Sequence, residues 1–232
     1  MNTAIITGSS DGLGKATALK LLEAGWRVHG LSRRATGIAH PEFISHSVDV
    51  TDELALQNAV VTIIEKSPVI DLLINNAGAA SMNAFMLTPG KVAENLMRLN
   101  YLGAFYCMQA VGKQMVRQRR GLIINITTVA APLALEGEAA YVASKAALDA
   151  LTQVVGKELK PQGVTVIGLG FGPVPTKLTR AVEAHKLQRL NESIGRPNGT
   201  SLSEAADFIL EAIQETNPAP GSIRYLGQIQ SR

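Results

Sequence analysis

Short apolar runs without polar alternation recur along this chain of 232 residues, and segments of helical length separate them. Such runs are typical of strands whose two faces are both buried in a parallel sheet. The candidate strands are residues 4–7, 27–31, 72–75, 121–126, 164–169 and 222–226. The candidate helices are residues 14–24, 52–66, 91–117 and 141–159. This alternation predicts an α/β fold with a doubly wound parallel sheet of about seven strands and helices on both faces.

The length and composition indicate a single domain, residues 1–232. A chain of this size is expected to bury roughly 70–75% of its unfolded surface, and a hydrophobic fraction of 46% supports a large core. Residues 176–201 differ in character, because basic side chains gather there ahead of a turn signal at 196–199. These side chains are Lys177, Arg180, His185, Lys186, Arg189 and Arg196. The stretch is predicted to be either a lid or insertion on the substrate side of a site or a solvated surface helix.

The N-terminal segment and the cysteine content favour a reducing compartment. Residues 1–3 lead directly into an apolar strand, which is unlike a signal peptide or a membrane span. The single Cys107 has no partner for an intrachain disulfide, and its apolar surroundings predict a core residue rather than a reactive one. We therefore expect a cytoplasmic protein that does not associate with membranes.

The net charge of +3 raises the question of nucleic-acid binding. The basic residues are scattered, however, and the densest cluster, Arg117, Arg119 and Arg120, lies near a predicted helix end, where cations complement the helix dipole. No nucleic-acid recognition motif accompanies them. We expect no nucleic-acid partner and predict no metal site, and an anionic cofactor would account for part of the positive charge.

A glycine-rich turn at residues 7–14, TGSSDGLG, joins the first strand to a helix. Glycine permits unusual backbone angles and a close approach to a pyrophosphate, and the helix N-terminus offers unpaired N–H groups to that anion. Because the turn follows a strand and precedes a helix, it predicts a dinucleotide site. The predicted contacts in this turn are Gly8, Ser10, Gly12, Leu13 and Gly14.

The end of the second strand predicts which dinucleotide is bound. An acidic residue there suits the ribose hydroxyls of NAD, whereas arginine suits a 2′-phosphate. This chain has Ser32, Arg33 and Arg34, which favours NADP(H), with NAD(H) still possible and a solvated turn as the alternative. Asp11 points the other way, because a basic residue in the glycine-rich loop would have strengthened the case for NADP(H).

Four motifs in order resemble the short-chain dehydrogenase/reductase family: TGSSDGLG at 7–14, DVT at 49–51, NNAG at 75–78 and YVASK at 141–145. The resemblance runs from residue 3 to about residue 176, some three quarters of the chain. It implies a Rossmann-type sheet and hydride transfer between a nicotinamide cofactor and a carbonyl or secondary alcohol of a small molecule. It also implies a homodimer or homotetramer assembled through the long helices at 91–117 and 141–159.

The resemblance also implies the catalytic residues. Tyr141 would exchange a proton with the substrate oxygen, and Lys145, one helical turn later, would hold the nicotinamide ribose. A neighbouring ammonium is expected to lower the pKa of the phenol. Thr128 stands where the family has a serine, and its hydroxyl can still donate a hydrogen bond, although a strand-end threonine without a role is the alternative. Asn100 matches an asparagine of the family's proton path; a capped or solvated helix residue is the alternative.

Further cofactor contacts follow from the same resemblance. Asn76, Ala77 and Gly78 would line the adenosine side, and Asn75 would tie central strands together. Asp49, followed by Val50, would reach the adenine amino group or instead cap the next helix. Val174 and Thr176 would contact the nicotinamide. The chain departs from the family at Phe171, where a proline is usual, and it lacks the usual C-terminal glycine pair.

We therefore expect an NADP(H)-dependent oxidoreductase. Thr128 and Phe171 leave room for a second interpretation, a cofactor-binding regulatory protein with weak or no catalysis. Intact Tyr141, Lys145 and Asn100 argue against that interpretation.

Overall fold

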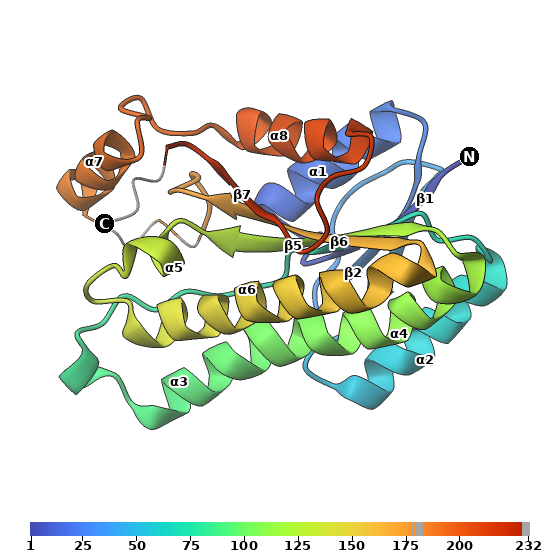
Figure 1. Ribbon diagram of the computed structural model, residues 1–232, viewed down its shortest axis with the longest axis horizontal. Coiled ribbons are helices and arrows are strands. Elements are labelled where there is room, and N and C mark those ends of the chain that lie inside the picture. The colour runs from blue at the N-terminus through green and yellow to red at the C-terminus, as the bar shows by residue number, and fades with distance from the viewer. Residues whose placement is uncertain (178, 180–182, 229–232) are drawn as a thin grey trace.

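The structure of the chain, a computed structural model, describes residues 1–177, 179 and 183–228 (Figure 1). The strands are β1 (Thr3–Thr7), β2 (Arg27–Ser32), β3 (Phe43–Ser47), β4 (Leu72–Asn75), β5 (Gly121–Thr128), β6 (Val164–Phe171) and β7 (Ile223–Leu226). The α-helices are α1 (Gly12–Glu23), α2 (Glu53–Lys66), α3 (Gly90–Leu96), α4 (Gly103–Gln118), α5 (Ala130–Leu133), α6 (Ala139–Leu159), α7 (Ala184–Ser193) and α8 (Leu202–Gln214). Two 3-10 turns, η1 (Phe85–Leu87) and η3 (Lys160–Gln162), and a π-helical segment, η2 (Met97–Leu102), complete the elements of the described chain.

Seven strands of the described chain form one parallel sheet in the order β3-β2-β1-β4-β5-β6-β7. The chain builds outward from β1 to β3 and then returns to β4 on the other side of β1. The strand order therefore reverses between β1 and β4, and the loops that leave these two strands diverge. This topology confirms the predicted doubly wound α/β fold and leaves a crevice at the carboxyl edge of the sheet.

Two layers of helices cover the sheet, with α1 and α8 on one face and α2, α4 and α6 on the other (Figure 1). Ile6, Ile74 and Ile167 belong to the first core. Their neighbours in sequence, Ile5, Leu73 and Val166, belong to the second. Adjacent residues of a strand point to opposite faces, so burial of both faces explains why the strand sequences lack polar alternation. No helix in the described parts of the chain is long and apolar enough to cross a membrane.

Helix α4 confirms two expectations about individual residues. Cys107 is 1% exposed within the second core, and this burial raises the pKa of its thiol to about 12. The arginine cluster lies at the helix end, where Arg119 adopts a left-handed conformation with φ of 54°. Arg120 follows it and pairs with Asp71 at 2.9 Å. The cysteine is a packing residue, and the cluster belongs to a helix terminus.

The structure corrects several element boundaries. Residues 91–117 are not one regular helix, because the π-helical segment η2 separates α3 from α4. Strands β5 and β6 extend two residues beyond their predicted ends, to Thr128 and Phe171. Strand β3 and helix α8 were absent from the prediction. β3 is an edge strand whose sequence, FISHS, is partly exposed. Helix α8 begins with a capping box between Ser201 and Glu204, and this spacing is a helix-start signal that the sequence contains.

A histidine pair links β2 to β3 inside the protein. The Nδ1 atom of His29 lies 3.0 Å from the Nε2 atom of His46, and the Nε2 atom of His29 lies 3.1 Å from the hydroxyl of Ser67. Burial, and after it the charges of His46, Arg27 and Lys66, together lower the pKa of His29 to about 4. Burial also lowers the pKa of His46. The folded protein therefore disfavours protonation of this pair.

We expect the free energy of unfolding to decrease as the pH falls from 6.5 towards 4. The unfolded chain binds a proton at His29 in this range while the folded chain does not, and the full shift corresponds to roughly 3 kcal/mol. Urea unfolding of wild type and His29→Asn across this range measures the effect, with the exposed His185→Asn as control. Equal slopes for wild type and His29→Asn would contradict the prediction.

Candidate active site

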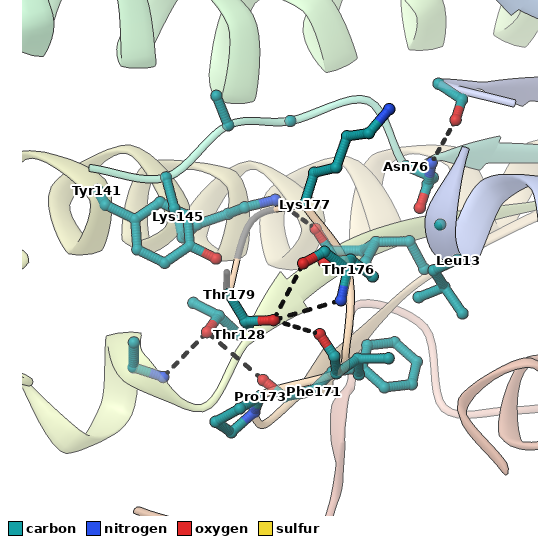
Figure 2. Close-up of a pocket in the computed structure, with 18 of the residues that line it drawn as sticks. Leu13, Asn76, Thr128, Tyr141, Lys145, Phe171, Pro173, Thr176, Lys177 and Thr179 are labelled. Atoms are coloured by element: carbon teal, nitrogen blue, oxygen red, sulfur yellow. Dashed lines mark hydrogen bonds between the residues drawn. The ribbon is translucent and has the colours of Figure 1, made fainter. Parts of the chain in front are cut away.

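A pocket of about 900 Å³ opens at the carboxyl edge of the sheet (Figure 2). Cavities that hold small ligands span roughly 300–1,000 Å³. The predicted site residues that line it are Gly8, Ser10, Gly12, Leu13, Ser32, Arg33, Arg34, Asp49, Val50, Asn76, Ala77, Gly78, Thr128, Tyr141, Lys145, Val174 and Thr176. Two further predicted residues, Gly14 and Asn100, are not on the pocket surface. Within the described residues, no group of three or more His, Cys, Asp or Glu side chains is placed to hold a metal ion.

The glycine-rich loop lies directly against the segment that follows β4. A Cβ atom at Gly8, where φ is +70°, would come within 2.9 Å of the Cα atom of Ala77. A Cβ atom at Gly14 would lie 2.4 Å from the Nδ2 atom of Asn76 and 2.6 Å from the carbonyl oxygen of Gly8. Both positions therefore require glycine. The loop presents bare backbone at the N-terminus of α1, where unpaired N–H groups and the helix dipole favour an anion.

The side chains of Thr7 and Asn76 fasten this loop to β4. The backbone N–H groups of Asn76 and Ala77 both donate to the Thr7 hydroxyl at 3.0 Å, and the Asn76 amide donates to the Thr7 carbonyl at 2.9 Å. Asn75 makes the tie expected of it, because its amide donates to the side-chain carbonyl of Asn125 on β5 at 2.8 Å. These bonds hold the carboxyl ends of β1, β4 and β5 in a fixed arrangement.

Helix α6 brings Tyr141 and Lys145 to the same pocket as Thr128, which ends β5 (Figure 2). Lys145 is buried, with 5% of the residue exposed, and its ammonium donates to the carbonyl oxygen of Ile126 at 2.7 Å. The Thr128 hydroxyl accepts a hydrogen bond from the N–H of Ala130 at 3.2 Å and donates to the Phe171 carbonyl at 3.5 Å. That second bond is long, so the threonine proton is available for another acceptor.

The pKa of Tyr141 differs from the sequence-based expectation. It is raised to about 12, mainly by burial and to a smaller extent by the carboxylates of Glu138 and Asp149, while the interaction with Thr128 opposes the increase. Burial also lowers the pKa of Lys145 to about 8. The expectation that the ammonium lowers the phenol pKa is wrong for this structure, because loss of solvation dominates at Tyr141.

Asp149 is an acidic neighbour of Tyr141 and Lys145 that the sequence analysis did not identify. Burial raises the pKa of its carboxyl to about 6, while a hydrogen bond with Thr127 and the charge of Lys145 lower it. Its negative charge in turn raises the pKa of Lys145. Asp149 follows Lys145 by four residues, and this helical spacing was the signal in the sequence that could have identified it.

Asn100 occupies the π-helical segment η2 and is buried. Its side-chain carbonyl accepts from the Ala79 N–H at 2.9 Å, and its amide donates to the Ala79 carbonyl and the Ser144 hydroxyl, each at 2.9 Å. Gly78 adjoins both Asn100 and Lys145, because a Cβ there would be 3.1 Å from the Asn100 carbonyl oxygen and 3.6 Å from the Lys145 nitrogen. The alternative of a capping or solvated residue is therefore wrong.

The end of β2 forms a basic edge of the pocket. Arg33 and Arg34 are exposed, and Arg33 lies 3.8 Å from the Asp49 carboxylate. The Ser32 hydroxyl donates to the Arg34 carbonyl at 2.6 Å and so shapes the turn. Asp49 accepts bonds from the N–H and hydroxyl of Thr51 at 2.9 Å, whereas Asp52 caps α2. The alternative that Asp49 caps this helix is wrong.

The segment after β6 forms the opposite wall. Phe171 is 5% exposed, and its ring contacts the ring of Phe208 of α8 edge-on, with 5.8 Å between the ring centres. The phenylalanine that replaces the family's usual proline therefore packs in the first core. The Thr179 hydroxyl donates to the Val174 carbonyl at 3.0 Å and accepts from the Thr176 N–H at 3.3 Å. This hydroxyl closes the loop that carries Val174 and Thr176 into the pocket.

Part of the basic stretch at residues 176–201 reaches the pocket as helix α7. Lys186, Leu187, Arg189, Leu190 and Ser193 line it, and they combine apolar with basic groups. Ile194 at the end of α7 is fully buried against the loop after β6, near Gly172. Arg180, which belonged to the same prediction, lies outside the described residues.

Comparison with known proteins places the chain among enzymes. Residues 2–187 match the model of the family described as short chain dehydrogenase. A 3-oxoacyl-(acyl-carrier-protein) reductase of Synechocystis sp. is 34% identical over 194 residues, covering 79% of this chain and 78% of the relative. A protein of the same name from Buchnera aphidicola is 30% identical over 214 residues, covering 90% of this chain and 88% of the relative.

Solved structures share the fold. ElxO with NADP bound matches with a TM-score of 0.88 at 22% identity, covering 97% of this chain and 96% of that chain. A short-chain dehydrogenase from Streptomyces avermitilis matches with a TM-score of 0.82 at 26% identity, covering 97% of this chain and 88% of that chain. The shared fold therefore extends over 97% of this chain in both comparisons.

Burial of Lys145 carries a stability cost that mutation should reveal. Below pH 8 the Lys145 amine is protonated in both the folded and the unfolded chain, and the full cost of burying the charge is present. Between pH 8 and 10.5 only the unfolded chain is protonated at Lys145, so the free energy of unfolding of the wild type rises as the pH increases. We expect Lys145→Met to raise the free energy of unfolding at pH 7 by about 1–3 kcal/mol, since the lost hydrogen bond offsets part of the gain.

Urea unfolding at pH 7, 8, 9 and 10 measures this difference, which should shrink as the pH rises. Lys157→Met, at an exposed position on the same helix, is the matched control and should show neither the gain nor the trend. A Lys145→Met protein that is less stable than wild type at pH 7 would contradict the prediction.

Proposed function

The chain belongs to the short-chain dehydrogenase family, and we propose that it is an NADPH-dependent reductase that converts a ketone of a small molecule to a secondary alcohol. The observation that carries this proposal is the composition of one pocket. Its nucleotide end has a glycine-rich loop and two arginines, and its other end has Tyr141, Lys145 and Thr128. Membership of the family establishes an oxidoreductase; the cofactor preference, the direction and the residue roles are our proposal.

The nucleotide end fits NADP(H) on two counts. Gly8 and Gly12 line the pocket at the N-terminus of α1, where backbone N–H groups and the helix dipole favour a pyrophosphate. Arg33 and Arg34 are exposed and can turn toward a 2′-phosphate, which arginine binds through two parallel N–H bonds. The further proposed contacts are Ser10, Gly12, Leu13, Ser32, Asp49, Val50, Asn76, Ala77, Gly78, Val174 and Thr176, with Tyr141 and Lys145 at the nicotinamide ribose.

The catalytic end supports proton donation. A bound nicotinamide supplies the hydride. Tyr141 keeps its proton at neutral pH because its pKa is near 12, and it donates this proton to the substrate oxygen. Thr128 turns its hydroxyl from the distant Phe171 carbonyl to the same oxygen and stabilises the developing negative charge. The same high pKa leaves little phenolate at neutral pH, so Tyr141 is present in the proton-donor form that reduction requires.

Proton resupply is proposed to run past Lys145 and Asn100. The Asn100 carbonyl oxygen and the Lys145 nitrogen both lie near the position that a Cβ atom of Gly78 would occupy. The absence of a Cβ at Gly78 leaves room between the two side chains, which is where a proton can pass through water. Asn100 is held by three hydrogen bonds to Ala79 and Ser144, so its carbonyl oxygen has a fixed direction.

We propose 3-oxoacyl thioesters as the first substrate class to assay. The relatives from Synechocystis sp. and Buchnera aphidicola bear the name of 3-oxoacyl-(acyl-carrier-protein) reductases. The pocket wall of α7 has Leu187 and Leu190 beside Lys186 and Arg189, which suits an apolar chain with an anionic end. In this proposal residues 176–201 form the substrate-side wall of a single domain, and the long helices α4 and α6 assemble a homodimer or homotetramer.

Replacing Tyr141 with phenylalanine removes the proposed proton donor and keeps the ring. We expect turnover of a 3-oxoacyl thioester with NADPH to fall by a factor of about 100–10,000 while NADPH affinity stays nearly unchanged. Steady-state rates and fluorescence titration with NADPH measure the two quantities. Tyr106→Phe on α4, outside the pocket lining, is the matched control and should retain wild-type rates. Retained turnover in Tyr141→Phe would remove this residue from the mechanism.

Replacing Arg33 with alanine tests the assignment of the 2′-phosphate. The variant should weaken NADPH binding about tenfold or more and NADH binding little, because a charge-assisted hydrogen bond contributes roughly 1.5–3 kcal/mol. Parallel titrations with both nucleotides give the ratio of dissociation constants, with the exposed Arg117→Ala on α4 as control. An equal loss for both nucleotides would overturn the assignment.

A further inference from the structure

An ion pair crosses the nucleotide end of the pocket. The Lys177 ammonium, on the loop after β6, lies 2.5 Å from the carboxylate of Asp11 in the glycine-rich loop. Both residues line the pocket, and Figure 2 shows the Lys177 side chain extending away from Thr176. The side chains are 54% and 47% exposed. A pair so exposed contributes little to folding stability. Because it lies at the nucleotide end of the pocket, its charges act on a bound nucleotide.

Asp11 is a permanent negative charge at this place. Hydrogen bonds from Lys177 and from the Gly12 N–H lower the pKa of its carboxyl, and the charges of Lys177 and Arg34 lower it further. Asp11 lines the same pocket as Arg33 and Arg34 at the end of β2. A carboxylate in this position opposes the binding of a phosphate by Arg33 and Arg34.

The fold holds Lys177 where it can cancel that charge. A Cβ atom at Gly12 would lie 3.2 Å from the Cγ2 atom of Thr176, so the loop after β6 touches the glycine-rich loop at the residue next to Lys177. The Thr179 hydroxyl closes the same loop through its bonds to Val174 and Thr176. Lys177 therefore reaches Asp11 from a segment distant in sequence but adjacent in space.

We propose that Lys177 is a specificity-determining residue for NADP(H), because its ammonium neutralises Asp11 and so allows a 2′-phosphate to bind between the glycine-rich loop and Arg33 and Arg34. The basic residue that would favour NADP(H) is missing from the glycine-rich loop itself, and the loop after β6 supplies it. This inference rests on the proposed function, since it concerns the preference between two nucleotides at the same site.

A double-mutant cycle tests the proposal through dissociation constants of NADPH and NADH, measured by fluorescence titration of the full chain. We expect Lys177→Met to weaken NADPH binding about tenfold and NADH binding much less, because only NADPH has the additional phosphate. We expect Asp11→Asn to bind NADPH at least as tightly as wild type. The double variant should recover most of the affinity lost in Lys177→Met, because no uncompensated carboxylate remains.

Two results would overturn the proposal. If the double variant binds NADPH as weakly as Lys177→Met, Lys177 acts on the nucleotide directly and not through Asp11. If both nucleotides lose affinity equally in Lys177→Met, the residue does not determine specificity. A wild-type protein that binds neither nucleotide would instead refute the proposed function, so the two failures are distinguishable.

Salt dependence and a second ion pair provide the controls. The loss in Lys177→Met should shrink as sodium chloride rises from 50 to 500 mM, since salt screens charges at exposed sites; a loss that is independent of salt would contradict the electrostatic account. Lys91 and Glu94 on α3 form an exposed pair at 3.0 Å outside the pocket lining. Lys91→Met should leave both dissociation constants unchanged.

Discussion

The reversal of strand order between β1 and β4 is the constraint on which the rest of the site depends. All strands of the described sheet are parallel, so their carboxyl ends meet at one edge, and the reversal separates the loops that leave β1 and β4. The Thr7 hydroxyl holds the two strand ends together by accepting from two backbone N–H groups of the β4 loop. The glycine-rich loop and the segment after β4, which form one end of the pocket, are positioned by this junction.

Desolvation dominates the electrostatics of the catalytic end. It raises the pKa of the Tyr141 phenol and lowers that of the Lys145 ammonium, so each group is pushed toward its neutral form. Asp149 opposes the second effect because its charge favours the protonated lysine. The phenol of Tyr141 keeps its proton, and the Lys145 ammonium is buried at a cost in stability. Shifted pKa values of this kind are common in active sites.

Much of the fold was predictable because the relevant signals are local. The unalternated apolar runs identified the buried strands, and the glycine-rich turn between a strand and a helix identified one end of the pocket. Edge strand β3 escaped prediction because its exposed face removes the continuous apolar run. The π-helical segment η2 escaped because the helical periodicity of residues 91–117 hardly changes across it, although this segment places Asn100. The glycine-rich loop and the Ser32, Arg33 and Arg34 group were identified from residue type and position, the other candidate site residues by resemblance, and the roles of all of them are still predictions.

The sequence by itself determined the class of fold, the order of the motifs and the chemical groups available to the pocket, because these follow from residue type and short-range spacing. Tertiary structure alone decided which charges meet. In the sequence Asp11 is an acidic residue that opposes NADP(H), whereas in the structure the Lys177 ammonium, from a loop more than 160 residues later, lies 2.5 Å from its carboxylate. The pKa of Tyr141 likewise depends on burial and not on the lysine four residues later. Electrostatic interactions act through space and depend on solvent exposure, and neither distance nor exposure is encoded in local sequence patterns.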